Sequence, residues 1–178
     1  MLELQILRAE IESHEAVDAA MTTLQEKRIL DEIPDTLILV QHPEVVTLGP
    51  KAERDGALEE SALSDYPTRV VDRGGGMTYH GPGQLVVYPI IKWQVGEQSV
   101  RKIINRLEDW VMAALADCGI EGYRDERMMG VRLEECFPKT IDAVPFAHAS
   151  SNTLNKCSVS FAYRYWRNIA TEVFFCCT

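Results

Sequence analysis

A glycine-rich run at residues 73–84 is the stretch whose residue types and spacing are suited to chemistry. It reads Arg-Gly-Gly-Gly-Met-Thr-Tyr-His-Gly-Pro-Gly-Gln and holds five of the protein's 11 glycines. Glycine loses more backbone freedom on folding than any other residue, so a cluster indicates positive φ angles or backbone that lies close to a bulky group. The run is therefore predicted to hold a ligand.

The spacing of these glycines disfavours a nucleotide as that ligand. The phosphate-binding pattern G-x-x-x-x-G-K-[ST] is absent from the run, and a G-x-G-x-x-G pattern would have to open a helix. Here the run is followed by Leu-Val-Val-Tyr-Pro-Ile-Ile, which is typical of a strand. Both the glycine spacing and the following element are wrong for a nucleotide loop.

Strands are predicted on both sides of the run, at residues 68–72 and 84–91, and the second is apolar enough to be buried on both faces. Further strands are expected at residues 2–7, 35–40 and 45–48. Two helices are expected, one capped by Ser13 and stopped before Pro34, the other capped by Ser99 and ended by Gly119. This order favours an α/β or α+β domain with a mixed β-sheet and flanking helices.

Composition supports a single domain over residues 1–178. The chain is 46% hydrophobic and 25% charged, which is enough to bury a core. Its formal net charge of −9 disfavours nucleic acid and anionic membranes as partners, because phosphate binding needs a basic face. Its five cysteines form no C-x-x-C pair, so neither a metal site nor a disulfide framework is expected. The amino-terminal composition is unlike a signal or transit peptide, which predicts a cytoplasmic protein.

Residues 73–84, followed by an apolar strand with Tyr-Pro-Ile, resemble the signature of the lipoyl(octanoyl) transferases. That family is grouped with the lipoate and biotin ligases. Residues 33–43, which end in Gln-His-Pro, and residues 46–49, Val-Thr-Leu-Gly, are similar to the early strands of the same family. The resemblance covers about residues 1–131, and residues 133–178 match the family poorly, as a divergent or truncated carboxy-terminal third would.

The resemblance implies a catalytic domain like that of the biotin and lipoate ligases, with one octanoyltransferase-like domain over residues 1–178. The implied reaction moves an octanoyl group from octanoyl-acyl carrier protein to a lysine of a lipoyl domain through a cysteine thioester. The implied acceptors are the lipoyl domains of 2-oxoacid dehydrogenase complexes and the glycine cleavage H protein. No cofactor, whether metal or nucleotide, is expected for this step of lipoate biosynthesis.

The resemblance also implies two catalytic residues. Cys176 best matches the family's nucleophile because an apolar run precedes it, and Cys177 is the fallback; Lys139 best matches the family's lysine. A thiolate that takes the acyl group first divides the transfer into two easier steps. A free cysteine has a pKa of about 8.5, and a nearby ammonium favours the thiolate by roughly one to two units. The lysine can also exchange protons with the amine and the departing thiol.

The substrate-binding residues that the resemblance implies form the first two-thirds of the run: Arg73, Gly74, Gly75, Gly76, Met77, Thr78, Tyr79 and His80. The glycines would let the acyl chain pass close to the backbone. Tyr79 and His80 would enclose and orient the thioester, and Arg73 would anchor the loop. His42 stays outside this site, because a histidine before proline is more often a turn residue than a catalytic base.

Two other functions stay open. One is a catalytically impaired paralogue or a truncated product that only binds an acyl chain or a carrier protein. The other is an ATP-using lipoate or biotin ligase, which nucleotide binding would reveal. Pro138, Pro145 and the Ser-Ser-Asn-Thr run at residues 150–153 also predict that regular strands form less readily in residues 133–178 than in the first 131.

Overall fold

The computed structural model describes residues 3–52, 65–124, 130–133, 157–166 and 169–177. The chain divides into two compact units. The first comprises Met1–Ser99 and Ala162–Phe174, and the second comprises Val100–Phe161 and Phe175–Thr178. The glycine-rich run lies entirely in the first unit.

The main sheet of the first unit has the strand order β1-β2-β6-β10. β1 pairs with β2 in parallel, β2 with β6 antiparallel, and β6 with β10 antiparallel, so the sheet is mixed as predicted. β6 is buried along nearly its whole length, which confirms the prediction of a strand covered on both faces. The bounds are β1 (Leu4–Ile11), β2 (Asp35–Gln41), β6 (Val86–Lys92) and β10 (Ile169–Cys177).

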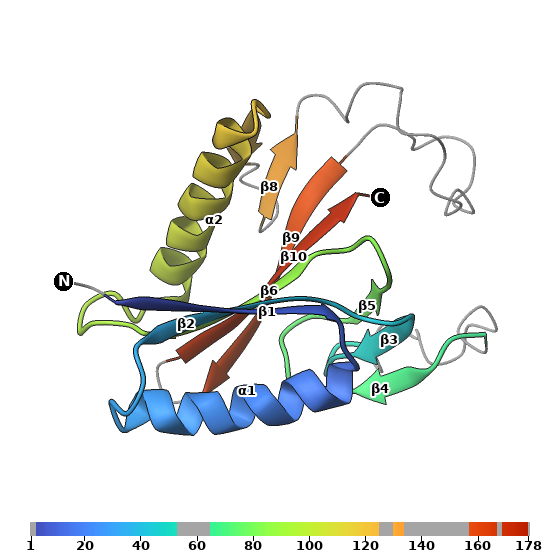
Figure 1. Ribbon diagram of the computed structural model, residues 1–178. Coiled ribbons are helices and arrows are strands. Elements are labelled where there is room, and N and C mark those ends of the chain that lie inside the picture. The colour runs from blue at the N-terminus through green and yellow to red at the C-terminus, as the bar shows by residue number, and fades with distance from the viewer. Residues whose placement is uncertain (1–2, 53–64, 125–129, 134–156, 167–168, 178) are drawn as a thin grey trace. The chain divides into compact units, whose positions relative to one another are not determined.

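Helix α1 (His14–Ile29) covers one face of this sheet, as the blue helix beside β1 and β2 shows (Figure 1). The Ser13 hydroxyl accepts a hydrogen bond from the Ala16 amide at 3.1 Å, which confirms Ser13 as the N-cap. Buried side chains of the helix and of alternate strand positions form the core. The burial of each large apolar side chain contributes about 1.5–3 kcal/mol to the stability of the fold. The core side chains are Val17, Met21, Ile38, Val40, Val86, Tyr88 and Ile90.

A second, three-stranded sheet of the first unit has the order β4-β3-β5. β3 (Val45–Leu48) pairs in parallel with β4 (Thr68–Val70) and antiparallel with β5 (Met77–His80). β5 was not predicted, because the surrounding glycines indicated a continuous loop. Its backbone is held by pairing with β3, in which Val45 lies opposite His80 and Leu48 opposite Met77.

The second unit contains helix α2 (Val100–Asp117) and the antiparallel strands β7 (Gly122–Arg124), β8 (Gly130–Leu133) and the first half of β9 (Cys157–Trp166). Gly119 has a φ of 75° just after α2, as predicted for a residue that ends a helix. The buried Glu108 carboxylate accepts hydrogen bonds from the Gly130 amide at 3.0 Å and from Arg124 Nε at 2.8 Å. This carboxylate therefore joins α2 to β7 and β8.

The expectation that strands form less readily in the last third is wrong for residues 157–166 and 169–177. β9 and β10 are 10 and 9 residues long, and they are longer than the other strands that the structure describes. Both segments lack proline and are rich in aromatic and β-branched residues, so strand propensity overrides the breakers that stand before them. The observed elements confirm the predicted fold class of mixed sheets with helices. Neither described helix is long and apolar enough to cross a membrane.

Candidate functional site

Residues 73–76 cross the end of β3 and are bonded to it through their backbone. The Gly49 amide donates to the Gly76 carbonyl at 2.9 Å, and the Lys51 amide donates to the Gly75 carbonyl at 3.1 Å. A Cβ at Gly49 would lie 2.5 Å from the Gly75 carbonyl oxygen, so only glycine permits this approach. Gly75 has a φ of 98°, which also favours glycine. The glycines of the run are thus explained by a close backbone crossing.

Arg73 turns beneath the loop that it begins and is 3% exposed. Its Nη2 atom donates to the Thr47 carbonyl at 2.9 Å and to the Thr47 hydroxyl at 2.7 Å. Its Nη1 atom donates to the Gly74 carbonyl at 3.2 Å. The guanidinium therefore ties residues 73–76 to the middle of β3, while its predicted contact with substrate stays a prediction.

Replacing Arg73 with lysine is expected to lower the free energy of unfolding by about 2–3 kcal/mol, because an ammonium keeps the charge but cannot reproduce the planar fork. Urea denaturation would measure this loss. Arg69→Lys is the matched control, since Arg69 is partly exposed and pairs with Glu15 and Asp18 at 3.4 and 3.7 Å. Surface pairs of that kind contribute about 0–1 kcal/mol. Equal losses in the two variants would contradict the anchoring role of Arg73.

His80 is fully buried, and both of its ring nitrogens have partners. Nδ1 lies 2.9 Å from the Gln84 Oε1 atom, and Nε2 lies 3.3 Å from the Thr47 hydroxyl. The Gln84 amide is oriented by donating through Nε2 to the Tyr79 carbonyl at 3.3 Å, so its oxygen faces the ring. Because an amide oxygen only accepts, Nδ1 of His80 carries the proton and Nε2 carries the lone pair.

Burial lowers the pKa of His80 to about 3, and the charges that His42, His14 and Arg73 can carry act in the same direction, while the hydrogen bond that His80 donates to Gln84 acts to raise it. The ring is therefore neutral at neutral pH. A group with this pKa is a poor general acid or base near pH 7, since efficient proton transfer needs a pKa near the working pH. His80 is better suited to hold its neighbours in place.

His42, which the sequence analysis left outside the site as a turn residue, directly follows the end of β2 and is also fully buried. Its Nδ1 atom lies 2.8 Å from the Glu12 carbonyl and must donate to it, while its Nε2 atom accepts from the Tyr88 hydroxyl at 2.7 Å. Burial is the main cause that lowers the pKa of His42. The ring is a neutral bridge between β1, β2 and β6.

His14, His42 and His80 form a histidine cluster, with ring centroids 5.3 to 5.9 Å apart. His14 is 7% exposed, and burial together with His42 lowers its pKa to about 4. Its Nδ1 atom is buried and has no hydrogen-bond partner among the residues that the structure describes. Within that part of the chain, no group of three or more His, Cys, Asp or Glu side chains could hold a metal ion. The cluster is therefore a packed, neutral core feature.

Tyr79 points away from this cluster, because successive residues of β5 face opposite sides of the sheet. Its hydroxyl donates to Glu44 Oε1 at 3.0 Å, and its ring lies edge-on to Tyr66 with centroids 5.4 Å apart. The structure brings Arg73 and His80 together through Thr47, but it does not bring the rings of Tyr79 and His80 to one point. Their predicted joint enclosure of a thioester stays a prediction.

The described structure does not test the two predicted catalytic residues, Cys176 and Lys139. Cys176 is a residue of β10. Lys139 lies outside the described residues. The proposed meeting of these side chains with the glycine-rich run stays a prediction.

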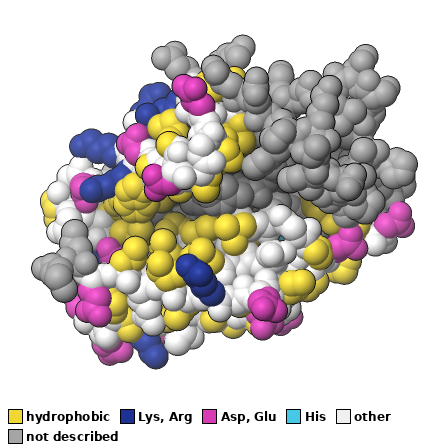
Figure 2. Space-filling view, turned by 45° about the horizontal axis from the view of Figure 1, so that its top comes forward, with side chains coloured by type: hydrophobic (Ala, Val, Ile, Leu, Met, Phe, Trp, Pro, Cys, Tyr) yellow, Lys and Arg dark blue, Asp and Glu magenta, His cyan; other side chains and the backbone are white. Residues whose placement is uncertain are grey.

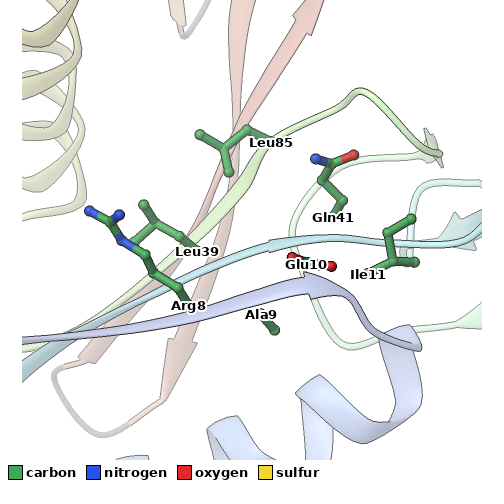
Figure 3. A pocket seen from close by; sticks show the side chains of 7 residues that line it. All are labelled: Arg8, Ala9, Glu10, Ile11, Leu39, Gln41 and Leu85. Carbon is green, nitrogen blue, oxygen red and sulfur yellow. The ribbon is translucent and has the colours of Figure 1, made fainter.

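A groove of about 680 Å³ lies beside the end of the glycine-rich run (Figure 3). Gln41, the last residue of β2, and Leu85, the residue just before β6, point into it, and the Gln41 Oε1 atom accepts a hydrogen bond from the Gly83 amide at 2.7 Å. Its walls are mainly apolar, and Figure 2 shows further hydrophobic side chains gathered on the surface. The lining residues are Arg8, Ala9, Glu10, Ile11, Leu39, Gln41 and Leu85. Its volume is typical of small-molecule sites.

Comparison with known families decides which one the chain belongs to. Residues 16–136 match the model of the lipoyl protein ligase A/B catalytic domain, which is more than half of the chain. The chain belongs to this family. The matched residues include the whole glycine-rich run, whereas Lys139 and Cys176 lie beyond them. The resemblance seen in the run is therefore confirmed.

Individual relatives agree with this assignment. The chain is 40% identical over 111 residues to an octanoyltransferase of Syntrophobacter fumaroxidans, covering 61% of this chain and 49% of that protein. It is 47% identical over 114 residues to an octanoyltransferase of Rubrobacter xylanophilus, covering 61% and 50%. The chain spans about half the length of these curated relatives.

Solved structures show the same fold. A bi-partite lipoate protein ligase of Thermoplasma acidophilum, studied with its E2 lipoyl domain, superposes with a TM-score of 0.56. The match covers 98% of this chain and 60% of that one, at 14% identity. At this level of identity, structural similarity shows that the two proteins share a fold and shows nothing about their reactions. It confirms the predicted lipoate-ligase-like architecture.

Sequence reasoning missed the partners that position the run. Thr47 and Gln84 stood inside the motifs that carried the resemblance, but neither received a role. His14 lies at the start of α1 and Tyr88 lies in the buried strand β6, and no motif around either residue indicated its contact with the other histidines or with His42. A signal for Gln84 was present, since a polar side chain four residues after a histidine in a turn can reach back to its ring.

Proposed function

We propose that the chain is an octanoyltransferase, which moves an octanoyl group from octanoyl-acyl carrier protein to a lysine of a lipoyl domain. The observation that carries this proposal is the glycine-rich run, bonded to β3, in a chain of the lipoyl protein ligase A/B family. Relatives named octanoyltransferases, at 40% and 47% identity, support the transferase over the ligase.

In the proposed reaction, the Cys176 thiolate is the nucleophile, and Lys139 donates and then accepts a proton. The Cys176 thiolate attacks the octanoyl carbonyl, the bond to the carrier sulfur breaks, and Lys139 gives that sulfur a proton. The acceptor's neutral amine then attacks the thioester on Cys176, Lys139 takes the amine's proton, and the Cys176 thiolate leaves. Both side chains end in their starting protonation states. The glycine-rich run would hold the acyl group close to its backbone.

The partners of this reaction are proposed with it. The acceptors are lipoyl domains of 2-oxoacid dehydrogenase complexes and the glycine cleavage H protein, and the presence of an E2 lipoyl domain with the T. acidophilum ligase supports that class. The place of action is proposed to be the cytoplasm. We also propose that residues 1–178 act as one catalytic domain, and the family match at 16–136, which includes residues of both compact units, supports this.

The alternative of an impaired, acyl-binding paralogue has less support. The relatives reported above are named for catalysis, and the run's backbone crossing and its buried arginine are intact. Similarity to lipoate ligases lies at the level of fold, so it does not favour an ATP-using reaction.

The test is a two-stage transfer assay read by intact-mass spectrometry. Incubation with octanoyl-acyl carrier protein is expected to add one octanoyl group, removable by hydroxylamine because a thioester reacts with it. Addition of a lipoyl domain is then expected to move the octanoyl mass onto that domain without ATP. Reversible binding with no covalent adduct would support the impaired paralogue, and transfer that needs octanoate and ATP would support a ligase.

A further inference from the structure

The hydroxyl of Thr47 joins the two halves of the glycine-rich run. Thr47 is fully buried in β3, two residues before Gly49. Its oxygen lies 2.7 Å from Arg73 Nη2 and 3.3 Å from His80 Nε2. Arg73 begins the loop and His80 ends β5, so one side chain contacts both ends of residues 73–80.

The protons at this junction have one consistent arrangement. Arg73 can only donate, so the Thr47 oxygen accepts from it. Nε2 of His80 carries a lone pair, because Nδ1 donates to Gln84. The single Thr47 proton is then shared between His80 Nε2 and the Thr78 carbonyl, both 3.3 Å away. The side chain at this position must accept a hydrogen bond from the Arg73 guanidinium and donate one to the His80 imidazole. A hydroxyl can do both.

We propose that Thr47 is a positioning residue for acyl transfer, whose hydroxyl holds the Arg73 loop and the neutral His80 ring in fixed relation. This inference rests on the proposed function. Thr47 is too deeply buried to touch the acyl group, so it acts through the run. Without its hydroxyl, His80 Nε2 loses the contact at 3.3 Å and Arg73 Nη2 loses the contact at 2.7 Å, which leaves both ends of the run less constrained.

Thr47→Val tests this role, because valine keeps the shape and removes the hydroxyl. The apparent affinity for octanoyl-acyl carrier protein in acyl loading is expected to fall at least about tenfold, because part of the binding free energy is then used to order the loosened run. Thr47→Ser, which restores the hydroxyl, is expected to recover most of it. Loading is measured well below the melting temperature of every variant.

Thr36→Val is the matched control. Thr36 is also fully buried in a strand, but its hydroxyl donates at 3.0 Å to the Pro34 carbonyl, away from the run. The two valine variants are expected to lose similar stability, and only Thr47→Val is expected to load poorly. Equal loading by both, or failure of Thr47→Ser to recover, would overturn the proposal.

Nitrogen-15 NMR of the histidine rings gives a readout independent of acyl transfer. The wild type is expected to show His80, assigned with His80→Asn, as the Nδ1–H tautomer, and Thr47→Val is expected to change the His80 Nε2 shift while leaving His42 unchanged. An Nε2–H tautomer in the wild type, or no response to Thr47→Val, would overturn the junction. If the wild type takes no octanoyl group, the proposed function fails, and these NMR results still decide whether Thr47 orders the run.

Discussion

Lowering the pH from 7.5 to 5.0 is expected to reduce the free energy of unfolding by about 4 kcal/mol, because His14 and His80 stay neutral in the folded protein. Their folded pKa values are about 4 and about 3, against 6.5 for an ordinary histidine. At pH 5 the unfolded chain therefore binds protons that the folded chain does not. Each histidine accounts for about 2 kcal/mol over this range.

The sign of the effect follows from the depressed pKa values. The stabilising contribution is complete above the unfolded pKa of 6.5, and it is lost as the pH falls from 6.5 toward the folded values. His42, whose pKa is also lowered, adds to the loss in the same direction. Asp31 has a pKa lowered from 3.8, so its contribution changes below this range.

Urea denaturation at half-unit steps between pH 5.0 and 7.5 measures the loss. His14→Gln, which cannot titrate, is expected to reduce the pH-dependent loss by about 2 kcal/mol while changing the stability at pH 7.5 much less. A wild-type stability that is flat across this range would contradict the burial of a neutral histidine cluster. A slope unchanged by His14→Gln would show that other groups produce it.

The elements that the sequence predicted correctly are those with local signals. Ser13 stands at the start of an apolar period and caps α1 with its own hydroxyl. Gly119 follows an apolar helical stripe and takes a positive φ. The apolar, β-branched run at residues 84–91 predicted a strand buried on both faces, and it forms β6. Such features depend on neighbours in the sequence, so they are readable without the fold.

The features that the sequence did not predict depend on contacts between distant segments. β5 exists because β3 supplies its hydrogen-bond partners, although glycines precede and follow it. The histidine cluster joins the start of α1, the end of β2 and the end of β5. Nothing near any one of these histidines in the sequence indicates the other two. Their burial and lowered pKa values are therefore properties of the fold.

Tyr79 and His80 illustrate how a strand changes a functional interpretation. As consecutive residues of a loop, they were expected to enclose one substrate group together. As consecutive residues of β5, they face opposite sides, with Tyr79 bonded to Glu44 and His80 bonded to Gln84. The alternation of β5 therefore separates the two side chains, and their joint enclosure of a substrate group stays a prediction.

Replacing Cys176 with serine is expected to abolish the octanoyl adduct formed from octanoyl-acyl carrier protein, which is the largest effect on activity predicted for this chain. An alcohol at neutral pH lacks the anionic fraction that a thiol has, so it accepts an acyl group from a thioester far more slowly. Intact-mass spectrometry after incubation with the donor measures the adduct. Cys177→Ser, in the adjacent residue of β10, and Cys118→Ser, in an exposed position after α2, are the matched controls and are expected to keep it.

Loss of the adduct in Cys177→Ser but not in Cys176→Ser would identify Cys177 as the nucleophile. An adduct in all three variants would exclude these cysteines from the transfer.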